Sequence, residues 1–483
     1  MRLPRAGVLL AILAGACVPP ERTTQIDIID QRQGYRYPRL EQMARKHLSD
    51  AFVVVSFSGG GTRAAALSMG ALQALQATIV ETPAGAEPLA DNIDLISSVS
   101  GGSVTAAYYA LEGQEGLPKF EKSFLKHDVQ GALLGTFLAP WTLARLATPS
   151  YARIDILRDY LDAHVYEGAT YQSVLDKIAE GKRWRPYVVI NAGDMTTGAV
   201  FSFTQDQFDL MCSDLSKLAL ADAVTASAAF PLAFTALTLK NHSPCPAQAE
   251  AVKQEGKGWI SVDGHPRPVY VNNDAKEQDL NPARFRRGRN ALTYLNENGR
   301  TLYVQLEDGG VSDNVGLTEP LTLVTSTNRS PSIRSRINRH EINRLIFIVV
   351  NARSEPDTSY STSSTPPGII DTILTTMGSP IDSTSFLLLD DLEATVQRPS
   401  DLKKTIVPVD FDYLADPECQ RRFRNLSTSW QLKDGQIDAL VALGDAMIRE
   451  SPSFRRLVDE LGGRIEAGPT IKQACDILQA VGS

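Results

Sequence analysis

Two stretches of the chain run in the order strand, glycine-containing turn, helix, and this order restricts the fold more than any other feature. Residues 51–57 are a continuous β-prone run that ends at Ser58-Gly59-Gly60-Gly61, and a helical pattern follows. The same order recurs as a strand at 93–97, a turn at 98–102 and a helix at 103–111. An uninterrupted apolar strand is typical of a sheet that is buried on both faces. We therefore expect an α/β fold whose largely parallel central sheet is flanked by helices on both faces.

Four further β-prone runs are expected to join this sheet, at residues 187–191, 199–203, 301–306 and 344–351. Hydrophobic content of 43% and charged content of 22% are close to the averages of soluble globular proteins, which disfavours a disordered chain. After the N-terminus, no stretch approaches the ~20 apolar residues that a membrane-spanning helix needs. The sequence therefore predicts a folded body that does not cross a membrane.

The pentapeptide Ser98-Val99-Ser100-Gly101-Gly102 lies where the second strand turns into its helix. A sharp turn of this kind can lift one side chain above the sheet edge, and it needs small residues two places before and two places after that side chain. The following helix directs its N–H groups and the positive end of its dipole at Ser100, which favours the negative charge of acyl transfer. The pattern predicts Ser100 as a nucleophile, although structural Ser/Gly turns are common.

The other turn, Gly59-Gly60-Gly61-Thr62-Arg63, has three glycines whose N–H groups are unobstructed. Such donors can stabilise an oxyanion, so we expect the oxyanion hole at Gly59, Gly60 and Gly61, with Arg63 adding charge or holding the loop. The loop lacks the Gly-Lys-Ser/Thr of a Walker nucleotide site. Gly59, Gly61 and Ala64 fit a loose dinucleotide fingerprint, but the next strand does not end in the acidic residue that this fingerprint requires.

Asp308 follows the run at 301–306, within Leu306-Glu307-Asp308-Gly309-Gly310. A carboxylate on such a turn can reach a nucleophile on a neighbouring strand, so Asp308 is the expected base; a purely structural Asp-Gly turn is the alternative. His265, beside Asp263, is the rival base of a Ser-His-Asp triad. Because His265 lies in a Pro-rich region with no predicted strand to position it, Asp308 is favoured.

The glycine loop, the Ser100 turn and Asp308-Gly309-Gly310 occur in the order and at the roles found in the patatin-like phospholipase family, which the chain resembles from about residue 51 to 444. Ala226-Ser227-Ala228-Ala229-Phe230-Pro231 and residues 191–198 also resemble segments of that family. The resemblance implies a Ser-Asp dyad without histidine, an oxyanion hole from the glycine loop and hydrolysis of acyl esters in phospholipids or lysophospholipids. Ser98 departs from the glycine that the family commonly has there.

Two other functions remain open beside hydrolysis. Acyl transfer to an alcohol would use the same residues, and a non-catalytic lipid or envelope binding module would keep the fold without the chemistry. Intact Ser100 and Asp308, together with the glycine loop, count against a pure binding module. No cofactor is expected, and no close Cys/His pair has the spacing of a zinc site.

The N-terminus has the layout of a secretory signal peptide over residues 1–16: Arg2 and Arg5, an apolar run at 6–13, then small residues. Ala14-Gly15-Ala16-Cys17 resembles the lipobox of bacterial lipoproteins, in which the chain is cleaved before the cysteine and the Cys17 sulfur is acylated; the usual Leu is displaced by one place. Ordinary cleavage or a plain N-terminal helix is the alternative. We expect an exported protein of the bacterial cell envelope, facing the periplasm or held at the outer membrane.

Charge restricts the partners of the mature chain. Removal of residues 1–16 removes two Arg and no acidic residue, so the formal charge of -8 becomes -10. This charge disfavours nucleic acid and gives no attraction to anionic lipid head groups. Contact with a membrane is therefore expected through the lipid anchor and apolar surface. The oligomeric state is not predicted.

Four cysteines follow Cys17, an even number that makes two disulfides plausible in an exported chain. Pairing Cys212 with Cys245 and Cys419 with Cys475 would close the shorter loops, but spacing alone does not prove the connectivity.

The expected organisation follows from these features. A signal peptide (1–16) precedes a tether with a short helix around 40–47 (17–50), a catalytic domain (51–415) and a C-terminal helical segment packed on the core (416–483). Within the catalytic domain, residues 117–165 are expected to form a cap or, alternatively, a buried core helix broken at Pro140. Residues 241–299 are expected to be an insertion of loops, and residues 354–367 a mobile Ser/Thr/Pro segment.

Overall fold

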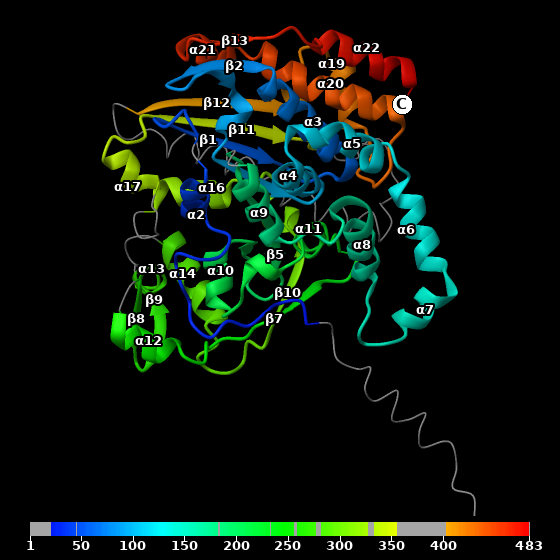
Figure 1. Ribbon diagram of the computed structural model, residues 1–483. Coiled ribbons are helices and arrows are strands. Elements are labelled where there is room, and N and C mark those ends of the chain that lie inside the picture. The colour runs from blue at the N-terminus through cyan, green and yellow to red at the C-terminus, as the bar shows by residue number, and fades with distance from the viewer. Residues whose placement is uncertain are drawn as a thin grey trace, which may run out of the picture.

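The computed structural model describes residues 21–44, 46–181, 184–231, 233–255, 258–276, 282–326, 333–354 and 402–482. Its centre is an eight-stranded sheet in the order β12-β11-β1-β4-β5-β10-β7, with β6 paired to β5 (Figure 1). Neighbours from β12 to β5 run parallel, whereas β10 and β6 are antiparallel to β5, and β7 is antiparallel to β10. The expected fold class, a largely parallel sheet between helices, is confirmed.

The strands of this sheet are β1 (Ala51–Phe57), β4 (Leu95–Val99), β5 (Tyr187–Asp194), β6 (Val200–Ser202), β7 (Leu237–Lys240), β10 (Tyr303–Asp308), β11 (Arg344–Asn351) and β12 (Lys403–Asp410). The small strands outside it are β2 (Thr78–Thr82), β3 (Gly85–Pro88), β8 (Trp259–Val262), β9 (His265–Pro268) and β13 (Arg464–Ile465). The strands β4 and β10 begin and end two residues later than expected, and thus reach the Ser100 turn and Asp308. The edge strands β7 and β12 were not expected, because β7 is short and β12 is half exposed and contains Pro408.

Helices cover both faces of the sheet. The helices α3 (Gly61–Gln76), α4 (Gly101–Glu112) and α20 (Asp434–Glu450) pack side by side, and Figure 1 shows α3 and α20 above the strands and α16 (Thr318–Thr325) below them. The other helices are α2 (Tyr37–Met43), α5 (Leu117–Phe120), α6 (Val129–Leu138), α7 (Pro140–Leu146), α8 (Arg153–Leu161), α9 (Tyr171–Gly181), α10 (Gln205–Leu210), α11 (Leu220–Ser227), α12 (Gln248–Glu255), α13 (Val269–Asp274), α14 (Pro282–Tyr294), α15 (Gly310–Asp313), α17 (Ile333–Asn338), α19 (Pro417–Arg424), α21 (Pro452–Glu460) and α22 (Ile471–Val481). In the described part of the chain, none of them has the length and apolar character that crossing a bilayer would require.

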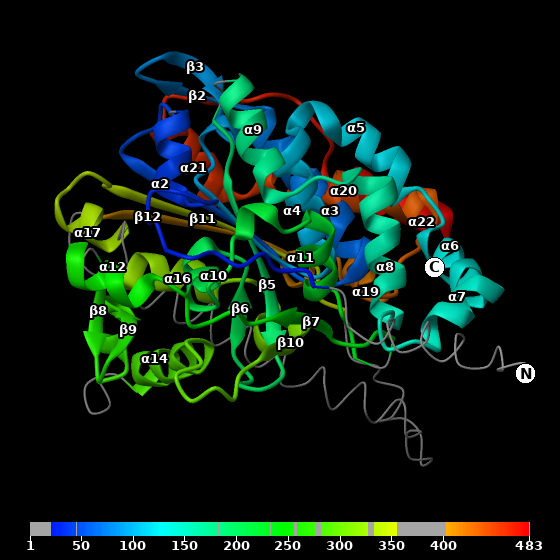
Figure 2. The ribbon, with the colours of Figure 1, turned by 60° about the horizontal axis from the view of Figure 1, so that its bottom comes forward.

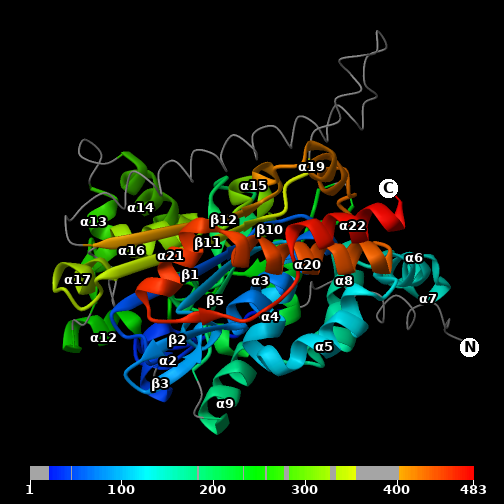
Figure 3. The ribbon, with the colours of Figure 1, turned by 90° about the horizontal axis from the view of Figure 1, so that it is seen from above.

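Two glycines allow α20 to cross α3 with their backbones in contact, as the view from above illustrates (Figure 3). A Cβ atom at Gly444 would lie 2.2 Å from the carbonyl oxygen of Leu67, and one at Gly70 would lie 2.0 Å from that of Val441. The C-terminal segment therefore packs directly on the helix that begins at the glycine loop.

The first described residues are bound to the body, so the expected tether over 17–50 is wrong for its described part. Tyr35 and Leu40 are buried, and α2 replaces the short helix expected around 40–47. Two arginines hold the segment through ion pairs: Arg22 with Asp155 and Asp222, and Arg36 with Asp206 and Asp209. These anchors have no regular spacing, which is why the sequence pattern resembles that of a solvated segment.

The insertion at 241–299 is more ordered than expected. It contains α12, α13 and α14 and the hairpin of β8 and β9, which lie together on the left side of the molecule in Figure 1, and α12, α14 and the hairpin also lie on that side in Figure 2. The signal peptide, Cys17 and the expected mobile segment from residue 355 onward lie outside the described residues.

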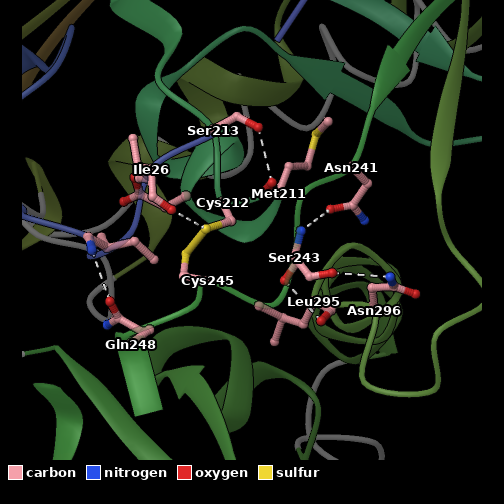
Figure 4. The surroundings of a disulfide bond; sticks show 12 residues. Ile26, Met211, Cys212, Ser213, Asn241, Ser243, Cys245, Gln248, Leu295 and Asn296 are labelled. Carbon is pink, nitrogen blue, oxygen red and sulfur yellow. Dashed lines mark hydrogen bonds between the residues drawn. A yellow bond between two sulfur atoms is a disulfide. The ribbon is translucent and has the colours of Figure 1, made fainter. Parts of the chain in front are cut away.

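Both expected disulfides are present. Cys212 is bonded to Cys245, and Cys419 to Cys475. Figure 4 shows the first bond beside Ile26, whose N–H donates to the Cys212 carbonyl at 3.0 Å. This disulfide thus also helps to hold the N-terminal segment.

The glycine contact between α3 and α20 can be tested with one methyl group. We expect Gly444→Ala to destabilise the protein by about 1–3 kcal/mol, since its Cβ overlaps a backbone oxygen that cannot rotate away. The matched control is Gly135→Ala in α6, whose Cβ meets nothing within 4 Å and which should stabilise the protein by about 0.5–1 kcal/mol. Urea denaturation would measure both, and equal stability of Gly444→Ala and the wild type would contradict the packing.

Candidate active site

The strand β5 brings Ser100 and Asp308 to the same level of the sheet. Val99, the last residue of β4, pairs with Asn191 of β5, and the next residue of β5, Ala192, pairs with Asp308 of β10. Ser100 and Asp308 therefore lie on opposite sides of β5. The Ser100 hydroxyl donates a hydrogen bond of 2.9 Å to Oδ2 of Asp308.

Ser100 occupies a strained turn. Its φ of 49° and ψ of -121° lie outside the regions that residues with a side chain favour, and Ser100 is the N-cap of α4. A strained serine between a strand and a helix is the geometry of a nucleophile elbow. Gly102 fits this turn closely, because a Cβ there would lie 2.6 Å from the Ser58 carbonyl oxygen.

Ser227, at the end of α11, supports the turn from beneath. Its hydroxyl accepts a hydrogen bond of 2.8 Å from the Ser100 N–H and donates one of 2.6 Å to the Asn191 carbonyl. Ser98 is buried, and its hydroxyl contacts the Val189 carbonyl at 3.3 Å and the Ser103 hydroxyl at 3.0 Å. A serine at this position, where the family that the chain resembles commonly has glycine, is thus accommodated by polar partners.

Burial controls the acidity of Asp308. Removal of its carboxylate from water raises the pKa of Asp308 to about 6, against the opposing effect of hydrogen bonds from the Gly310 N–H and the Ser100 hydroxyl. The Gly310 N–H donates to Oδ1 at 2.8 Å, which leaves Oδ2 for Ser100. A carboxylate with this pKa is ionised at neutral pH and basic enough to accept a proton.

The glycine loop lies against the Ser100 turn, with Gly60 and Gly61 at positive φ. Gly101 has no Cβ, and one added there would lie 2.0 Å from the Gly61 carbonyl oxygen. The expectation that Gly59 donates to an oxyanion is wrong, because its N–H already donates to the Asn314 carbonyl at 3.0 Å. Within the described residues, no hydrogen bond uses the N–H of Gly60 or Gly61.

Of the two roles expected for Arg63, a place in the oxyanion hole is wrong and holding the glycine loop is confirmed. The Arg63 side chain is buried and donates to the carbonyls of Ala352 and Leu426 and to the Thr428 hydroxyl. Burial lowers the pKa of Arg63 to about 10, which still leaves it charged at neutral pH. Arg63 therefore ties the glycine loop to the end of β11 and to the segment between α19 and α20.

A cavity of about 710 Å³ opens beside the two polar side chains. Ser100, Asp308 and Gly61 line its floor, and its walls are mainly apolar. The wall residues come from α6, α8, the segment after α11 and the segment before α20; they include Leu133, Phe137, Ile156, Phe230, Phe234 and Trp430. The segment 131–141 is mostly exposed, which excludes the alternative of a buried core helix.

The rival base lies elsewhere. His265 is an exposed residue of β9 and does not line the cavity of Ser100. Among the described residues, no cluster of three His, Cys, Asp or Glu side chains could hold a metal ion.

Sequence reasoning missed several residues that shape the site. The sequence marks Ser227 only as part of a family-like segment, and its contact with Ser100 depends on how α11 packs on β5. Thr428, Ser429 and Trp430 line the cavity from a segment more than 100 residues after Asp308. Nothing in the pattern around them distinguishes that segment from an ordinary loop.

Comparison with known families agrees with this geometry. A family model described as patatin-like phospholipase matches residues 55–321, more than half of the chain. The chain belongs to the patatin-like phospholipase family. At family level this patatin-like protein is a lipid acyl hydrolase, which makes it a carboxylic ester hydrolase with a lipid substrate.

Solved structures similar to this patatin-like protein include human GIVD cytosolic phospholipase A2, with 12% sequence identity and a TM-score of 0.42. A second structure of that human enzyme, in complex with a methyl gamma-linolenyl fluorophosphonate inhibitor and terbium chloride, has 12% identity and a TM-score of 0.35. Each match covers 95% of this chain and 67% of the other. Comparison with curated proteins finds no match.

The buried Asp308 carboxylate should reduce the stability of the fold. Because its folded pKa of about 6 exceeds the ordinary 3.8, ionisation is harder in the folded state, and the free energy of unfolding falls as the pH rises between these values. The isosteric Asp308→Asn has no charge to bury. We expect Asp308→Asn to equal the wild type near pH 4 and to exceed it by up to about 3 kcal/mol above pH 6–7, as measured by urea denaturation. A difference independent of pH would contradict this account.

Proposed function

We propose that the protein is a serine acyl hydrolase that cleaves fatty-acyl esters of phospholipids or lysophospholipids through Ser100 and Asp308. The 2.9 Å hydrogen bond between the two side chains, on the floor of a mainly apolar cavity, is the observation that carries the proposal. A nucleophile in contact with a base is the arrangement needed for covalent acyl transfer.

In the first step Asp308 Oδ2 accepts the Ser100 proton while Oγ attacks the ester carbonyl carbon. The carbonyl oxygen becomes an oxyanion, for which the N–H groups of Gly60 and Gly61 and the N-terminus of α4 are the candidate donors. The protonated Asp308 then gives its proton to the departing alcohol, the lysolipid or glycerol backbone, and an acyl-serine remains.

In the second step a water molecule takes the place of the alcohol. Asp308 accepts one proton of this water, the resulting hydroxide attacks the acyl-serine carbonyl, and Ser100 recovers its proton as the fatty acid leaves. Asp308 serves both half-reactions, which is why its position and pKa govern the whole cycle.

The apolar walls support a fatty-acyl substrate. Leu133, Phe137, Ile156, Phe234 and Trp430 offer surface for an alkyl chain directly beside Ser100. Burial of each CH₂ group of the acyl chain in this cavity would contribute about 0.8 kcal/mol to the free energy of binding.

We also propose that the protein is exported and anchored in the bacterial cell envelope through acylated Cys17. The signal-like residues 1–16 and the lipobox-like segment before Cys17 support this location. The two disulfides also support it, since structural disulfides form and persist in oxidising compartments. Mass spectrometry of the N-terminal peptide from the membrane fraction would test it: a diacylglyceryl group on Cys17 is expected, and a free thiol would contradict the anchor.

Substitution of the two polar residues tests the mechanism. We expect Ser100→Ala to abolish hydrolysis of p-nitrophenyl butyrate, because the covalent route is lost. Asp308→Asn should lower kcat by about 10²–10⁴, the usual contribution of a general base. Both variants should keep the wild-type circular dichroism spectrum.

His265→Ala is the matched control, since His265 is the rival base and is exposed; it should retain wild-type activity. A fluorophosphonate probe should add one label to the wild type and none to Ser100→Ala, as read by intact mass. Full activity of Ser100→Ala, or loss of activity in His265→Ala, would refute the Ser100–Asp308 dyad.

The pKa of Asp308 also sets a pH dependence. Only the ionised carboxylate can accept the Ser100 proton, so kcat/KM should rise with pH, level off above the pKa of about 6, and fall tenfold per pH unit below it. Initial rates on a soluble ester between pH 4.5 and 8.5 would measure this; a rate that falls on the alkaline side near pH 7 would instead indicate an essential protonated group.

A further inference from the structure

The helices α6 and α7 carry the largest concentration of exposed apolar side chains in the described part of the chain. Nine large apolar side chains are exposed in the whole described part of the chain, and four of them lie within ten consecutive residues of α6 and α7: Leu134, Leu138, Trp141 and Leu143. Trp141 is 70% exposed. Figure 1, Figure 2 and Figure 3 all place α6 and α7 at the outer edge of the molecule.

The helix α6 is apolar on two sides. Val129 and Leu133 are buried against the body with Phe137 beside them, whereas Leu134 and Leu138, one helical turn apart, face outward. Large apolar side chains gathered on a protruding helix are unusual on a soluble surface, and such a patch marks a contact with another molecule or a membrane.

The patch is continuous with the mouth of the cavity. Leu133, Leu134 and Phe137 line the cavity that contains Ser100, and the exposed Leu134 belongs to both surfaces. Whatever covers the outer face of α6 therefore lies where substrate enters.

Charge along this segment differs from that of the whole chain. Between Asp128 and Asp155 there is no acidic residue but there are two arginines, Arg145 and Arg153, although the chain has a net charge of -8. The segment thus has no negative charge that the phosphate groups of a lipid bilayer would repel.

The start of the described chain lies at the same side. Arg22 is bound to Asp155 of α8, and α8 contributes to the cavity wall. Cys17 precedes Arg22 by five residues, which span at most about 17 Å. An acyl group on Cys17 would therefore enter a membrane within about that distance of the Arg22 backbone.

We propose that the outer face of α6 and α7 docks on a lipid bilayer, so that the cavity of Ser100 opens onto the membrane surface. The substrate is then a lipid drawn from the bilayer, and this reading of the substrate rests on the proposed function. Trp141 and Leu138 insert into the interface, where apolar burial rather than charge provides the affinity.

The test uses the mature chain, residues 17–483, with Cys17→Ser to prevent acylation and Ser100→Ala to prevent hydrolysis. Sedimentation with phosphatidylcholine vesicles measures binding. We expect the double substitution Leu138→Ser with Trp141→Ser to weaken partitioning at least ~10-fold, given the apolar area of two large side chains. The matched control Leu302→Ser removes an exposed leucine elsewhere and should bind as well as the parent chain.

Fluorescence gives a second measurement. Trp184 and Trp259 are buried, whereas Trp430 is partly buried and lines the cavity, so the measurement uses a chain with Trp430→Phe. In that chain the emission of the exposed Trp141 should move to shorter wavelength when vesicles are added, and a further Trp141→Phe should lose this shift while keeping the binding. In a chain with Ser100 intact, the double variant should hydrolyse p-nitrophenyl butyrate within about twofold of the wild type, because neither side chain lines the cavity, yet lose at least ~10-fold of its rate on vesicles.

Each outcome decides the proposal. Equal vesicle binding by the double variant and its parent, or no binding by the parent, would overturn the docking surface. So would a dimer in size-exclusion chromatography that the double variant abolishes without any effect on vesicles, which would make a second copy the partner. If the wild type did not hydrolyse the soluble ester at all, the proposed function would be refuted, but the vesicle-binding result would still stand.

Discussion

The hydrogen bond between Ser100 and Asp308 depends on β5, which lies between the two strands that carry them. The strand β4 is parallel to β5 and its last residue pairs with Asn191, whereas the antiparallel β10 overlaps β5 only through its last three residues, which pair with residues 192–194. This register brings a serine and a carboxylate to one level. The close approach also requires bare backbone: a Cβ at Gly309 would lie 2.2 Å from the Asn191 carbonyl oxygen, and one at Gly101 would overlap the glycine loop. Sheet pairing fixes the positions of Ser100 and Asp308 along β5, and the glycines let the surrounding backbone segments pack closely enough for the two side chains to meet.

The site is assembled at a cost to stability. Ser100 keeps a strained backbone, and Asp308 keeps a carboxylate out of water, so both must be imposed by the surroundings. The hydrogen bonds of Ser227 beneath the turn provide part of this support, and the three bonds from Arg63 provide another part by holding the glycine loop. A fold that stabilised these groups more would have a Ser100 and an Asp308 less suited to proton transfer.

The parts of the fold that could be predicted from the sequence are those encoded locally. The run at 51–57 and the glycines that follow it specify a buried strand and a turn, and the small residues around Ser100 specify an elbow, so the fold class and the pair Ser100 and Asp308 could be named without coordinates. Gly59 shows the limit of that reasoning: its N–H is taken by Asn314, a contact between segments some 250 residues apart in the chain. The contacts of the Arg63 side chain could not be predicted from the sequence either, because its partners Ala352 and Leu426 lie close to it only in the folded chain.

Residues outside the matched family region also shape the active site through contacts between distant parts of the chain. Residues 55–321 contain Ser100, Asp308 and the glycine loop, but the loop is clamped from β11 and from the segment after α19, and Trp430 forms part of the cavity wall. The helix α20 then packs on α3 through Gly70 and Gly444, which fixes that segment against the helix that begins at the loop. At the other end, Arg22 ties the start of the described chain to α8, which borders the same cavity, and to α11, which precedes another part of the cavity wall. Segments near the two ends of the chain thus hold parts of the cavity wall, whereas the middle of the chain supplies Ser100 and Asp308. The shape of the cavity, unlike its chemistry, is therefore a property of the whole chain.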